Sequence, residues 1–335
     1  MPRNILIVRF SSIGDLLLAT PLLRAIRTRH PDSRITFVVR EDLADALRHN
    51  PHINELVTWR RHTPLTDLVH TLRAQRWTDR LDLHGSLRSF ALRRRVGGRW
   101  TGYPKHRLRR TLLIASRGKF GGSLGMVADR YFVAARHLDV VPDGKPAEFF
   151  ISERANADAD EFLRQHRIGQ DRPLIALAPG AAHFTKRWPE QHWRELAGRL
   201  SARYDMVVLG GTAEERVART IADAAGPAAA SATGLVTLEG SAALLRRAER
   251  LVCGDTGLLH LATAVGTPVV GLYGPTVEAF GFFPYHARAV TLQHDLDCRP
   301  CSSQGGPKCP LGHHNCLVQM MPDEVLTALT TSRGS

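Results

Sequence analysis

Short apolar runs alternate with helical patterns along the first part of this chain, and this alternation constrains its fold more than any other feature. The pattern predicts strands at residues 4–10, 34–40, 55–59 and 80–83. It predicts helices at residues 14–30 (bent near Pro21), 42–48, 64–75, 86–96 and 129–138. Because each strand is followed by a helix, we expect the strands to lie parallel in one doubly wound sheet.

The same alternation restarts after residues 140–148, where proline and glycine interrupt both periodicities. It predicts helices at residues 152–165, 189–203, 213–224 and 242–248, and strands at residues 173–178, 206–209, 250–253 and 268–273. With 335 residues, the chain is long enough for two cores. We therefore expect an α/β protein with Rossmann-like domains at residues 1–145 and 150–318 and a C-terminal helix or tail at residues 319–335. The two domains are expected to face a central cleft, with ligands at the carboxyl ends of the strands.

Several classes of protein are disfavoured by what the sequence lacks. No Gly-x-Gly-x-x-Gly follows a predicted strand, which argues against an NAD(P)-dependent enzyme, and no Gly-x4-Gly-Lys-Ser/Thr indicates a P-loop NTPase. No apolar run approaches the ~20 residues that span a bilayer. The first residues lead directly into the apolar run at residues 5–8 and not into a cleavable leader. We therefore expect a cytoplasmic protein.

The seven residues 254–260, Gly-Asp-Thr-Gly-Leu-Leu-His, are typical of a phosphate-binding turn. They follow one predicted strand and open the helical pattern at residues 258–265. Such a turn offers unpaired backbone N–H groups, the hydroxyl of Thr256 and little side-chain bulk at Gly257, all at a helix N-terminus. The sequence therefore predicts a nucleotide or sugar-nucleotide site in the C-terminal half.

Four residues near such a site each have a structural and a functional interpretation. Asp255 could cap the following helix or orient sugar hydroxyls. His260 lies one turn into that helix and could be structural or could face the phosphate. Glu214 and Glu215 follow a predicted strand, where an acid could bind ribose hydroxyls or could simply stabilise a first helical turn.

Asp15 stands just past the first predicted strand, within Ser11-Ser-Ile-Gly-Asp15. At the carboxyl end of that strand it could act as a general base on an acceptor hydroxyl. Ser12 and Asp15 also have the spacing of a capping box, in which Asp15 would satisfy N–H groups at a helix start. The local pattern supports both interpretations.

The loop at residues 179–189 follows the first strand of the second domain. Gly180 permits close approach of the backbone to a ligand. Thr185 and Lys186 could bind a diphosphate through a hydroxyl and an ammonium group. The alternative is a solvated loop with one exposed cation.

The formal net charge is +13, and residues 83–128 contain eleven Lys or Arg but no Asp or Glu. Such a stretch favours a polyanionic partner, namely nucleic acid, an anionic membrane surface or a phosphorylated substrate. The alternative is charge that serves only solubility. Aromatic residues are sparse in the stretch and no RNA-binding signature interleaves them, so nucleic acid is not the expected partner.

Four of the five cysteines crowd into Cys298-x2-Cys301-x7-Cys309-x6-Cys316. In a cytoplasmic protein such a cluster indicates a metal site rather than disulfides. The spacing, however, is not that of a zinc finger or ribbon, so thiols in a compact loop are the alternative to structural zinc. We predict no other metal site. Cys253 lies in a predicted strand and is expected in the core.

Several of these segments occur together, in the same order, in a known family. They are residues 5–15 with Pro21 downstream, residues 82–89, Pro179-Gly180 with residues 186–189, Gly210-Gly211 with Glu214-Glu215, residues 254–260, and Cys309-Pro-Leu-Gly-His-His-x-Cys316. On these motifs the chain resembles the ADP-heptose:lipopolysaccharide heptosyltransferases of glycosyltransferase family 9. The cysteine-containing tail resembles the heptosyltransferase II branch.

The resemblance implies a GT-B fold and an inverting transfer of L-glycero-D-manno-heptose from ADP-heptose to the lipopolysaccharide inner core, onto a heptose already attached. It implies no catalytic metal and no cofactor, with ADP-heptose as co-substrate. Asp15 would be the base and Lys186 the cation that assists the leaving diphosphate. The implied donor-binding residues are Thr185, Lys186, Glu214 or Glu215, Asp255, Thr256, Gly257 and His260.

The resemblance also gives the basic stretch a role, because lipid A and the inner core carry phosphates and carboxylates. It implies an acceptor site in the N-terminal domain with Ser12, Gly14, Arg88 and Lys105 as candidates. Arg107, Arg109 and Arg110 are further candidates to face the acceptor or an anionic membrane, so the protein could lie peripherally on the inner face of the inner membrane. Two other classes stay open at this point, namely a transferase for another donor such as a UDP-sugar and a basic nucleic-acid-binding protein.

Overall fold

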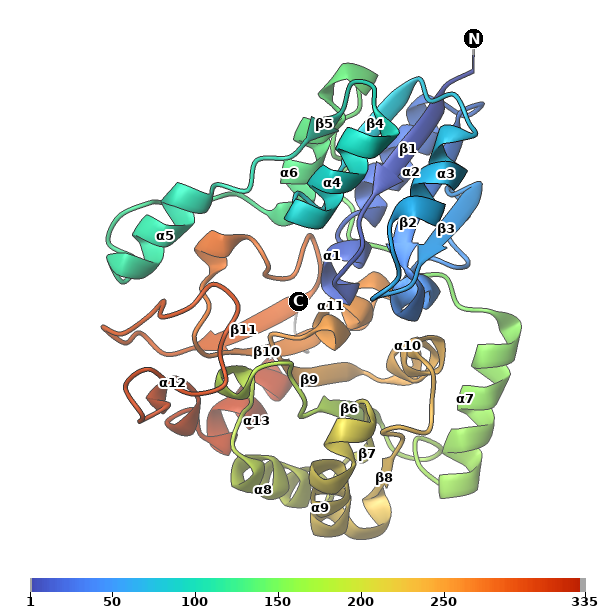
Figure 1. Cartoon of the computed structure of the whole chain (residues 1–335). Helices are drawn as coiled ribbons and strands as arrows, with labels where there is room; N and C mark the ends of the chain where they lie inside the picture. Colours follow the sequence, from blue (N-terminus) through green and yellow to red (C-terminus); the bar gives the residue numbers. More distant parts are fainter. Residues whose placement is uncertain (1, 332–335) are drawn as a thin grey trace. The chain divides into compact units, whose positions relative to one another are not determined.

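The computed structural model describes residues 2–331. Contacts divide the chain into two compact units (Figure 1). Unit 1 comprises Met1–His106 and Gly125–Phe150, and unit 2 comprises Arg107–Leu124 and Ile151–Ser335. Residues 107–124, which fall inside the range expected for the N-terminal domain, thus group with unit 2.

Unit 1 contains one parallel sheet with strand order β3-β2-β1-β4-β5. Its strands are β1 (Asn4–Val8), β2 (Arg34–Arg40), β3 (Glu55–Trp59), β4 (Asp79–Asp82) and β5 (Thr101–Gly102). Strand β1 lies in the middle and pairs in parallel with β2 through Ile5 opposite Ile35 and with β4 through Ile7 opposite Leu81. The doubly wound parallel sheet predicted from the alternation is therefore confirmed for this unit.

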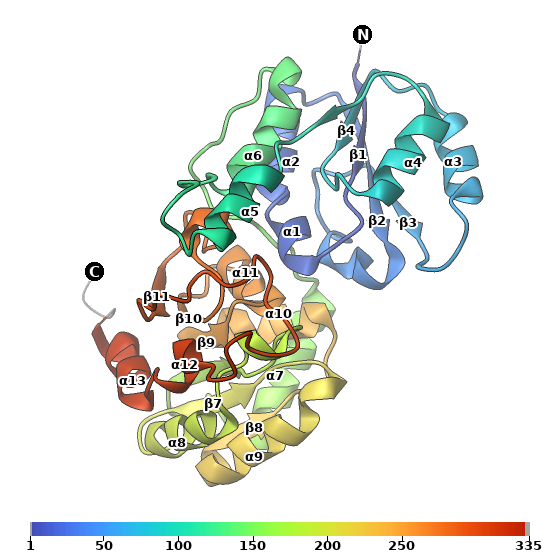
Figure 2. The same ribbon diagram turned by 60° about the vertical axis from the view of Figure 1, so that its left-hand side comes forward.

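Helices cover both faces of this sheet (Figures 1 and 2). They are α1 (Ile13–Leu17), α2 (Thr20–Arg29), α3 (Thr66–Arg73), α4 (Leu87–Val96) and α6 (Val127–Ala134). Helices α3 and α4 lie on one face, and α2 and α6 pack together on the other. On the first face, Leu6 and Val8 of β1 share a core with Leu72 of α3 and Leu92 of α4. Because alternate residues of β1 point to opposite faces, all of its apolar side chains are buried.

The single helix predicted at residues 14–30 is wrong, because the chain forms two helices, α1 and α2, with a break at Leu18-Ala19. Pro21 occupies the first turn of α2, where its missing N–H costs no helical hydrogen bond. The proline thus helps to start a helix here and does not bend one. Strand β5 was not predicted, since two residues cannot show a periodicity.

Unit 2 contains a second parallel sheet, with strand order β11-β10-β9-β6-β7-β8. The strands are β6 (Leu174–Ala178), β7 (Asp205–Val208), β8 (Ala229–Ser231), β9 (Arg250–Gly254), β10 (Val269–Tyr273) and β11 (Ala289–Gln293). Strands β6 and β9 are neighbours at the centre, with Ala176 opposite Leu251. Their carboxyl ends, to which the predicted phosphate turn and the loop at residues 179–189 belong, therefore meet at one edge.

The helices of unit 2 are α5 (Arg107–Ala115), α7 (Glu153–His166), α8 (Glu190–Leu200), α9 (Glu215–Ala225), α10 (Leu238–Arg247), α11 (Gly257–Ala264), α12 (Asn315–Val318) and α13 (Pro322–Thr331). Helices α8, α9 and α13 cover one face of the sheet, with Trp193 and Leu196 at the centre of their core. Helices α7, α10 and α11 cover the other face.

The sequence missed four of the helices and strands of unit 2. Strand β8 lies in an alanine-rich connection, and alanine is a poor strand former, so neighbouring β7 decides its conformation. Strand β11 and helices α5 and α12 were also not predicted. The tail expected at residues 319–335 contains α13, and its last four positions, 332–335, lie outside the described residues. Within the described part of the chain, no helix is both long enough and apolar enough to cross a membrane.

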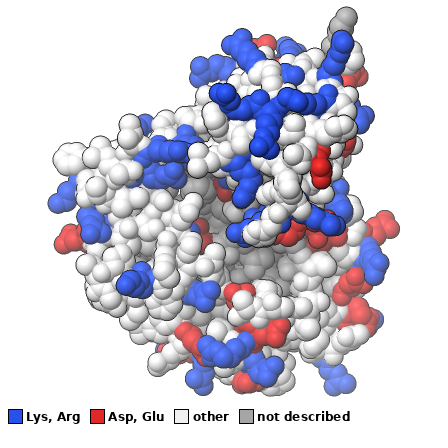
Figure 3. Space-filling view, in the orientation of Figure 1, with Lys and Arg blue, Asp and Glu red and all other residues white. Residues whose placement is uncertain are grey.

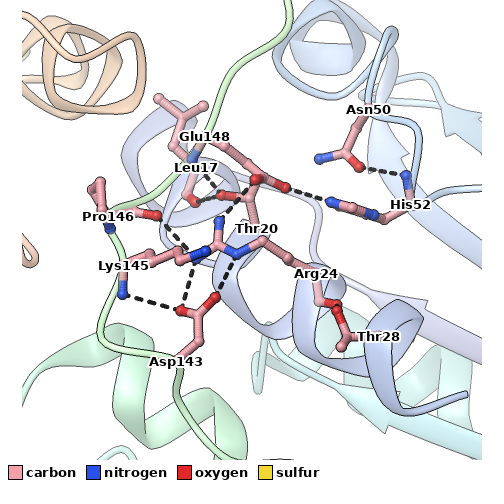
Figure 4. Close-up of polar contacts among 10 residues, drawn as sticks. All are labelled: Leu17, Thr20, Arg24, Thr28, Asn50, His52, Asp143, Lys145, Pro146 and Glu148. Atoms are coloured by element: carbon pink, nitrogen blue, oxygen red, sulfur yellow. Dashed lines mark hydrogen bonds and ion pairs between the residues drawn. The ribbon is translucent and has the colours of Figure 1, made fainter.

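A polar cluster fastens the last segment of unit 1 to α2 (Figure 4). The guanidinium of Arg24 donates two hydrogen bonds to Asp143, at 2.7 and 2.9 Å, and one of 2.7 Å to Glu148. His52 Nε2 lies 2.8 Å from the other oxygen of Glu148, and the Glu148 N–H donates to Thr20 Oγ1 at 2.9 Å. The hydrogen bonds from Arg24 lower the pKa of Asp143 to about 2. Arg24 thus fixes the segment at which the chain leaves unit 1.

We expect Arg24→Met to lower the free energy of unfolding of unit 1 by about 2 kcal/mol, because charged hydrogen bonds are lost while the apolar stem is kept. The folded pKa of Asp143 lies below its ordinary value of 3.8, so its stabilisation is complete above that pH and is lost as pH falls through about 2. The gap between wild type and variant in urea unfolding should therefore shrink as the pH is lowered toward 2. Arg29→Met, at an exposed position of the same helix, is the matched control. A gap that is the same at every pH would contradict the assignment of the effect to this cluster.

Candidate functional site

Asp15 of unit 1 lies in the first turn of α1, directly beyond the carboxyl end of β1. Its Oδ2 atom is 2.5 Å from Nη2 of Arg9, the residue that follows the last residue of the strand. The side chains of Arg9 and Asp15 are only 7% and 13% exposed. The two charges therefore form an ion pair that is largely shielded from water, although a small part of the Asp15 side chain stays accessible.

Three other groups hold the same carboxylate. The N–H and the hydroxyl of Ser12 donate to Asp15 Oδ2 at 3.2 and 2.9 Å, and the hydroxyl of Tyr131 donates to Oδ1 at 3.2 Å. The Ser12 contacts are those of the capping box anticipated from the sequence. Arg9 and Tyr131 go beyond what a helix cap requires, and both were missed by the sequence analysis.

Burial raises the pKa of Asp15, but the charge of Arg9 and the hydrogen bonds from Ser12 outweigh it, so the pKa is lowered overall. Asp15 is therefore a carboxylate at neutral pH. Arg9 stays cationic, because the Asp15 charge raises the pKa of the guanidinium although its burial acts to lower it. An ionised and partly accessible carboxylate can accept a proton from a hydroxyl.

We expect Arg9→Gln to move the acid limb of the pH profile of kcat/KM to higher pH. Without Arg9, burial still raises the pKa of Asp15, and only the hydrogen bonds from Ser12 remain to lower it. The carboxylate form of Asp15 would then be lost at a higher pH than in the wild type. Arg93→Gln is the matched control, since Arg93 pairs with a different buried carboxylate, that of Asp82, at 3.4 Å. An acid limb that does not move in Arg9→Gln would exclude Asp15 as the titrating group.

Lys105 and His84 lie in the same region of unit 1 as Asp15. Burial, together with the charges of Arg9 and Lys105, lowers the pKa of His84 to about 4, so its imidazole is neutral. A Cβ atom added at Gly85 would lie 2.8 Å from Lys105 Cε, so the lysine stem rests directly on this glycine. The structure thus brings Ser12, Lys105 and Asp15 into one region.

The other two candidates for the acceptor site take different positions. Gly14 is buried within α1. Arg88 lies over the ring of Trp59, with its guanidinium carbon 4.8 Å from the ring centroid.

In unit 2, Lys186 and Asp255 form an ion pair where β6 and β9 end. Lys186 Nζ lies 2.6 Å from Asp255 Oδ2, and the side chains are 14% and 11% exposed. Thr276, which follows β10, donates a hydrogen bond of 2.8 Å to the same oxygen. The sequence predicted Lys186 and Asp255 separately, and the structure joins them. Thr276 was missed, although its place after the next strand was a usable signal.

The backbone around this ion pair is closely packed. A Cβ atom added at Gly254 would lie 2.7 Å from the carbonyl oxygen of Lys186. The lack of a side chain at Gly254 therefore lets the loop that carries Lys186 pack against it. Thr185 is buried, and its hydroxyl accepts a hydrogen bond of 2.8 Å from the N–H of Gly306. His314 Nε2 lies 3.0 Å from the carbonyl oxygen of Thr185. The hydroxyl expected to contact a diphosphate is thus bonded to the loop that carries the cysteines, while Lys186 keeps its ammonium group at the strand ends.

Helix α11 begins directly after Asp255. Thr256 is its N-cap, Gly257 its first residue, and His260 is buried within its first turns. No side-chain cap is bonded to this helix start. Because the first N–H groups of a helix have no partner within it, they and the Lys186 ammonium provide positive potential on both sides of Asp255.

Glu214 and Glu215 point to different places. Glu214 accepts a hydrogen bond of 2.9 Å from the N–H of Gly211 and lies against Gly180, where an added Cβ would be 2.6 Å from its carboxyl carbon. The exposed Glu215 lies against Gly234, where an added Cβ would be 2.6 Å from its Oε1. Glu214 is therefore the one that lies over the carboxyl end of β6, the strand that leads to Lys186.

All five cysteines are free thiols. Burial raises the pKa of Cys301 and that of Cys316, the latter to about 11, and the neighbouring thiols act in the same direction. These two groups are therefore protonated at neutral pH. Among the described residues, no three Cys, His, Asp or Glu side chains are arranged to hold a metal ion. Cys253 lies fully buried in β9, as the sequence predicted.

Comparisons with known proteins agree with this architecture. Lipopolysaccharide heptosyltransferase 2 of Salmonella typhimurium is 27% identical over 352 residues, which cover 97% of this chain and 97% of that protein. The structure of ADP-heptose LPS heptosyltransferase II from E. coli matches with a TM-score of 0.76 at 24% identity, over 98% of each chain. A glycosyl transferase family 9 structure from Veillonella parvula matches with a TM-score of 0.81 at 24% identity, over 98% of this chain and 96% of that one. The structural likeness shows the fold, which is the two-domain GT-B fold implied by the sequence motifs.

Membership of a family follows from two further matches. Residues 65–310 match the model of glycosyltransferase family 9 (heptosyltransferase). Lipopolysaccharide heptosyltransferase 1 of Pseudomonas aeruginosa is 30% identical over 322 residues, which cover 89% of this chain and 86% of that protein. The chain therefore belongs to glycosyltransferase family 9, the heptosyltransferases.

Proposed function

We propose that this protein is an inverting glycosyltransferase that moves L-glycero-D-manno-heptose from ADP-heptose onto the lipopolysaccharide inner core. The donor would bind unit 2 and the acceptor unit 1. The observation that carries the proposal is the Lys186–Asp255 ion pair at the start of α11. The donor is taken from the structurally similar ADP-heptose LPS heptosyltransferase II of E. coli.

The donor half of the proposal rests on charge and geometry within unit 2. Lys186 and the N–H groups at Thr256 and Gly257 would hold the diphosphate. When a phosphate binds to Lys186, the pairing of Lys186 with Asp255 would weaken. Asp255 would then accept hydrogen bonds from the heptose hydroxyls. Glu214 is the candidate for the ribose, because its carboxylate lies over the end of β6. His260, which is buried within α11, would stabilise the first turns of that helix.

The acceptor half of the proposal rests on Asp15. In the proposed step an acceptor hydroxyl gives its proton to Asp15, and its oxygen forms a bond to the anomeric carbon of the heptose. The bond between that carbon and the β-phosphate oxygen breaks, and ADP leaves with the electron pair. Lys186 and the start of α11 would stabilise the charge that develops on the leaving group, so the step needs no metal ion and no cofactor.

The acceptor would be the lipid-A-anchored inner core at the inner face of the inner membrane, with Lys105 and Arg88 as candidates for its phosphates and carboxylates. The Cys309-Pro-Leu-Gly-His-His motif, similar to the heptosyltransferase II branch, supports transfer onto the first heptose rather than onto Kdo. Nucleic acid is not a partner in this proposal.

The test is release of ADP by the purified protein from ADP-heptose, with heptosyl-Kdo2-lipid A, with Kdo2-lipid A, and without acceptor. We expect release that depends on the heptosylated acceptor and that persists after treatment with EDTA. Turnover with Kdo2-lipid A alone would reassign the acceptor. Binding of UDP-sugars in place of ADP-heptose would overturn the donor, and loss of activity on chelation would overturn the metal-free step.

A further inference from the structure

Helix α5 and the turn after it, residues 107–120, expose large apolar side chains to solvent. Leu108 is 87% exposed, Leu112 is 49% exposed and Phe120 is 65% exposed. Leu108 and Leu112 are four residues apart on a helix, so they lie on the same face one turn from each other. A row of apolar side chains on a helix surface marks an interaction site more often than scattered single residues do.

The opposite side of α5 is anchored within unit 2. Leu113 is buried in a small cluster with Leu124 and Phe280. The Leu124 N–H donates a hydrogen bond of 2.9 Å to the carbonyl of Ala279. Arg117 donates one of 3.0 Å to the carbonyl of Cys298. The exposed row is therefore presented by an element that is held in place on its other side.

A second set of contacts shapes the turn that follows α5. The guanidinium of Arg109 donates to the carbonyl of Gly121 at 2.9 and 3.1 Å and to that of Ser123 at 3.0 Å. Gly121 has a φ of +111°, and an added Cβ atom would lie 2.9 Å from the Arg109 carbonyl oxygen, so only glycine fits this turn. The Arg109 contacts close the segment into a compact unit that ends in the exposed Phe120.

The charged residues within the segment that carries the exposed apolar row all have one sign. Residues 107–120 contain Arg107, Arg109, Arg110, Arg117 and Lys119, and no acidic residue. In Figure 3, the surface where Figure 1 shows α5 is blue and white, and red surface appears only farther down the left edge. Apolar side chains among cations match a bilayer interface with anionic headgroups, where the apolar groups enter the acyl boundary and the cations meet phosphates. Two leucines and one phenylalanine offer no stacking platform of the kind that nucleic acids need.

We propose that residues 107–120 form a docking surface for an anionic phospholipid bilayer, with Leu108, Leu112 and Phe120 inserted at the interface. This inference deepens the proposed function, on which it rests for the presence of a lipid-anchored acceptor. The surface itself needs neither donor nor acceptor, so its failure and the failure of the transferase assignment can be told apart.

The experiment is cosedimentation of the full chain with vesicles of phosphatidylcholine alone or mixed with phosphatidylglycerol, both free of lipopolysaccharide. We expect binding to the anionic vesicles only, and at least about a tenfold loss of partitioning in Leu108→Ser/Leu112→Ser/Phe120→Ser. In Arg110→Gln/Lys119→Gln, partitioning onto the anionic vesicles should fall about fivefold for each charge removed, and it should depend less strongly on salt concentration. Leu235→Ser/Leu311→Ser, which changes two exposed leucines of unit 2 outside the segment, is the control that should bind as the wild type does.

The same triple variant separates docking from catalysis. It should retain wild-type turnover of a deacylated, water-soluble acceptor and lose turnover of the acceptor embedded in vesicles. Equal binding of wild type and triple variant, or equal binding to both kinds of vesicle, would overturn the docking surface. Loss of turnover with the soluble acceptor would overturn it as well, because the segment would then belong to the reaction itself.

Discussion

Asp15→Asn should lower kcat by about 10²- to 10⁴-fold, the usual contribution of a general base. Asparagine keeps the shape of the side chain and one accepting oxygen, which can still accept the hydrogen bonds of Ser12 or that of Tyr131, while the basic carboxylate is lost. The affinity for ADP should not change, because the ligands proposed for ADP are in unit 2. The measurement is kcat with saturating donor and acceptor, together with ADP binding by calorimetry.

This variant also removes the counterion of a buried guanidinium, which can cost about 3–5 kcal/mol of stability. The control is therefore the double variant Arg9→Gln/Asp15→Asn, which leaves no unpaired charge. It should unfold at a higher urea concentration than Asp15→Asn and remain as inactive. If the double variant regained activity, Asp15 would be a structural partner of Arg9 and the helix cap, and the base would have to be sought elsewhere.

Lys186→Met should lower kcat by about 10²- to 10³-fold, the loss expected when one stabilising group for a developing negative charge is removed. It should also weaken ADP binding, because Asp255 then faces the diphosphate without its counterion. Lys186→Arg should not rescue the loss, since a planar guanidinium cannot replace a compact ammonium at a closely packed loop. Lys308→Met, at an exposed lysine of the same unit, is the matched control.

The double variant Lys186→Met/Asp255→Asn tests the coupling between the two residues. Removing the carboxylate along with the ammonium should restore part of the ADP affinity lost in Lys186→Met, because the repulsion between Asp255 and the phosphates disappears. If the loss of ADP affinity in the double variant equals the product of the losses in Lys186→Met and Asp255→Asn, the two residues act on ADP independently and not as an ion pair.

The fold was predictable from sequence because most strands in this chain are runs of largely buried residues and most helices are amphipathic. The elements that escaped prediction are those in which neighbours outweigh local preference. Strand β8 is made of Ala229, Ala230 and Ser231 and forms because β7 offers a partner edge. Helix α5 has one buried residue, Leu113, so its pattern resembled a solvated basic stretch. The break between α1 and α2 followed from Pro21 in a first turn, a position that periodicity does not reveal.

The positions of the candidate residues were predictable where the residues follow a strand end, as at Asp15, Lys186 and Asp255. Its supporting residues were not, because they come from distant parts of the chain. Tyr131 reaches Asp15 across 116 positions, and nothing near it in sequence marks it. Arg9 offered a signal that could have been used. It is a charged residue at the end of an apolar strand, and a buried charge needs a partner.

The bond between Thr185 and Gly306 spans 121 residues and has a consequence for proteolysis. The turn that carries Lys186 is bonded to the C-terminal cysteine loop through Gly306 and His314. A cut within residues 298–316 would therefore weaken the contacts that hold this turn in place. Linkage makes this coupling reciprocal. A nucleotide that orders the turn carrying Lys186 must therefore also protect the cysteine loop from a protease. If the donor binds at the lysine turn as proposed, we expect it to lower the nick rate at this loop, a readout that requires no acceptor and no turnover.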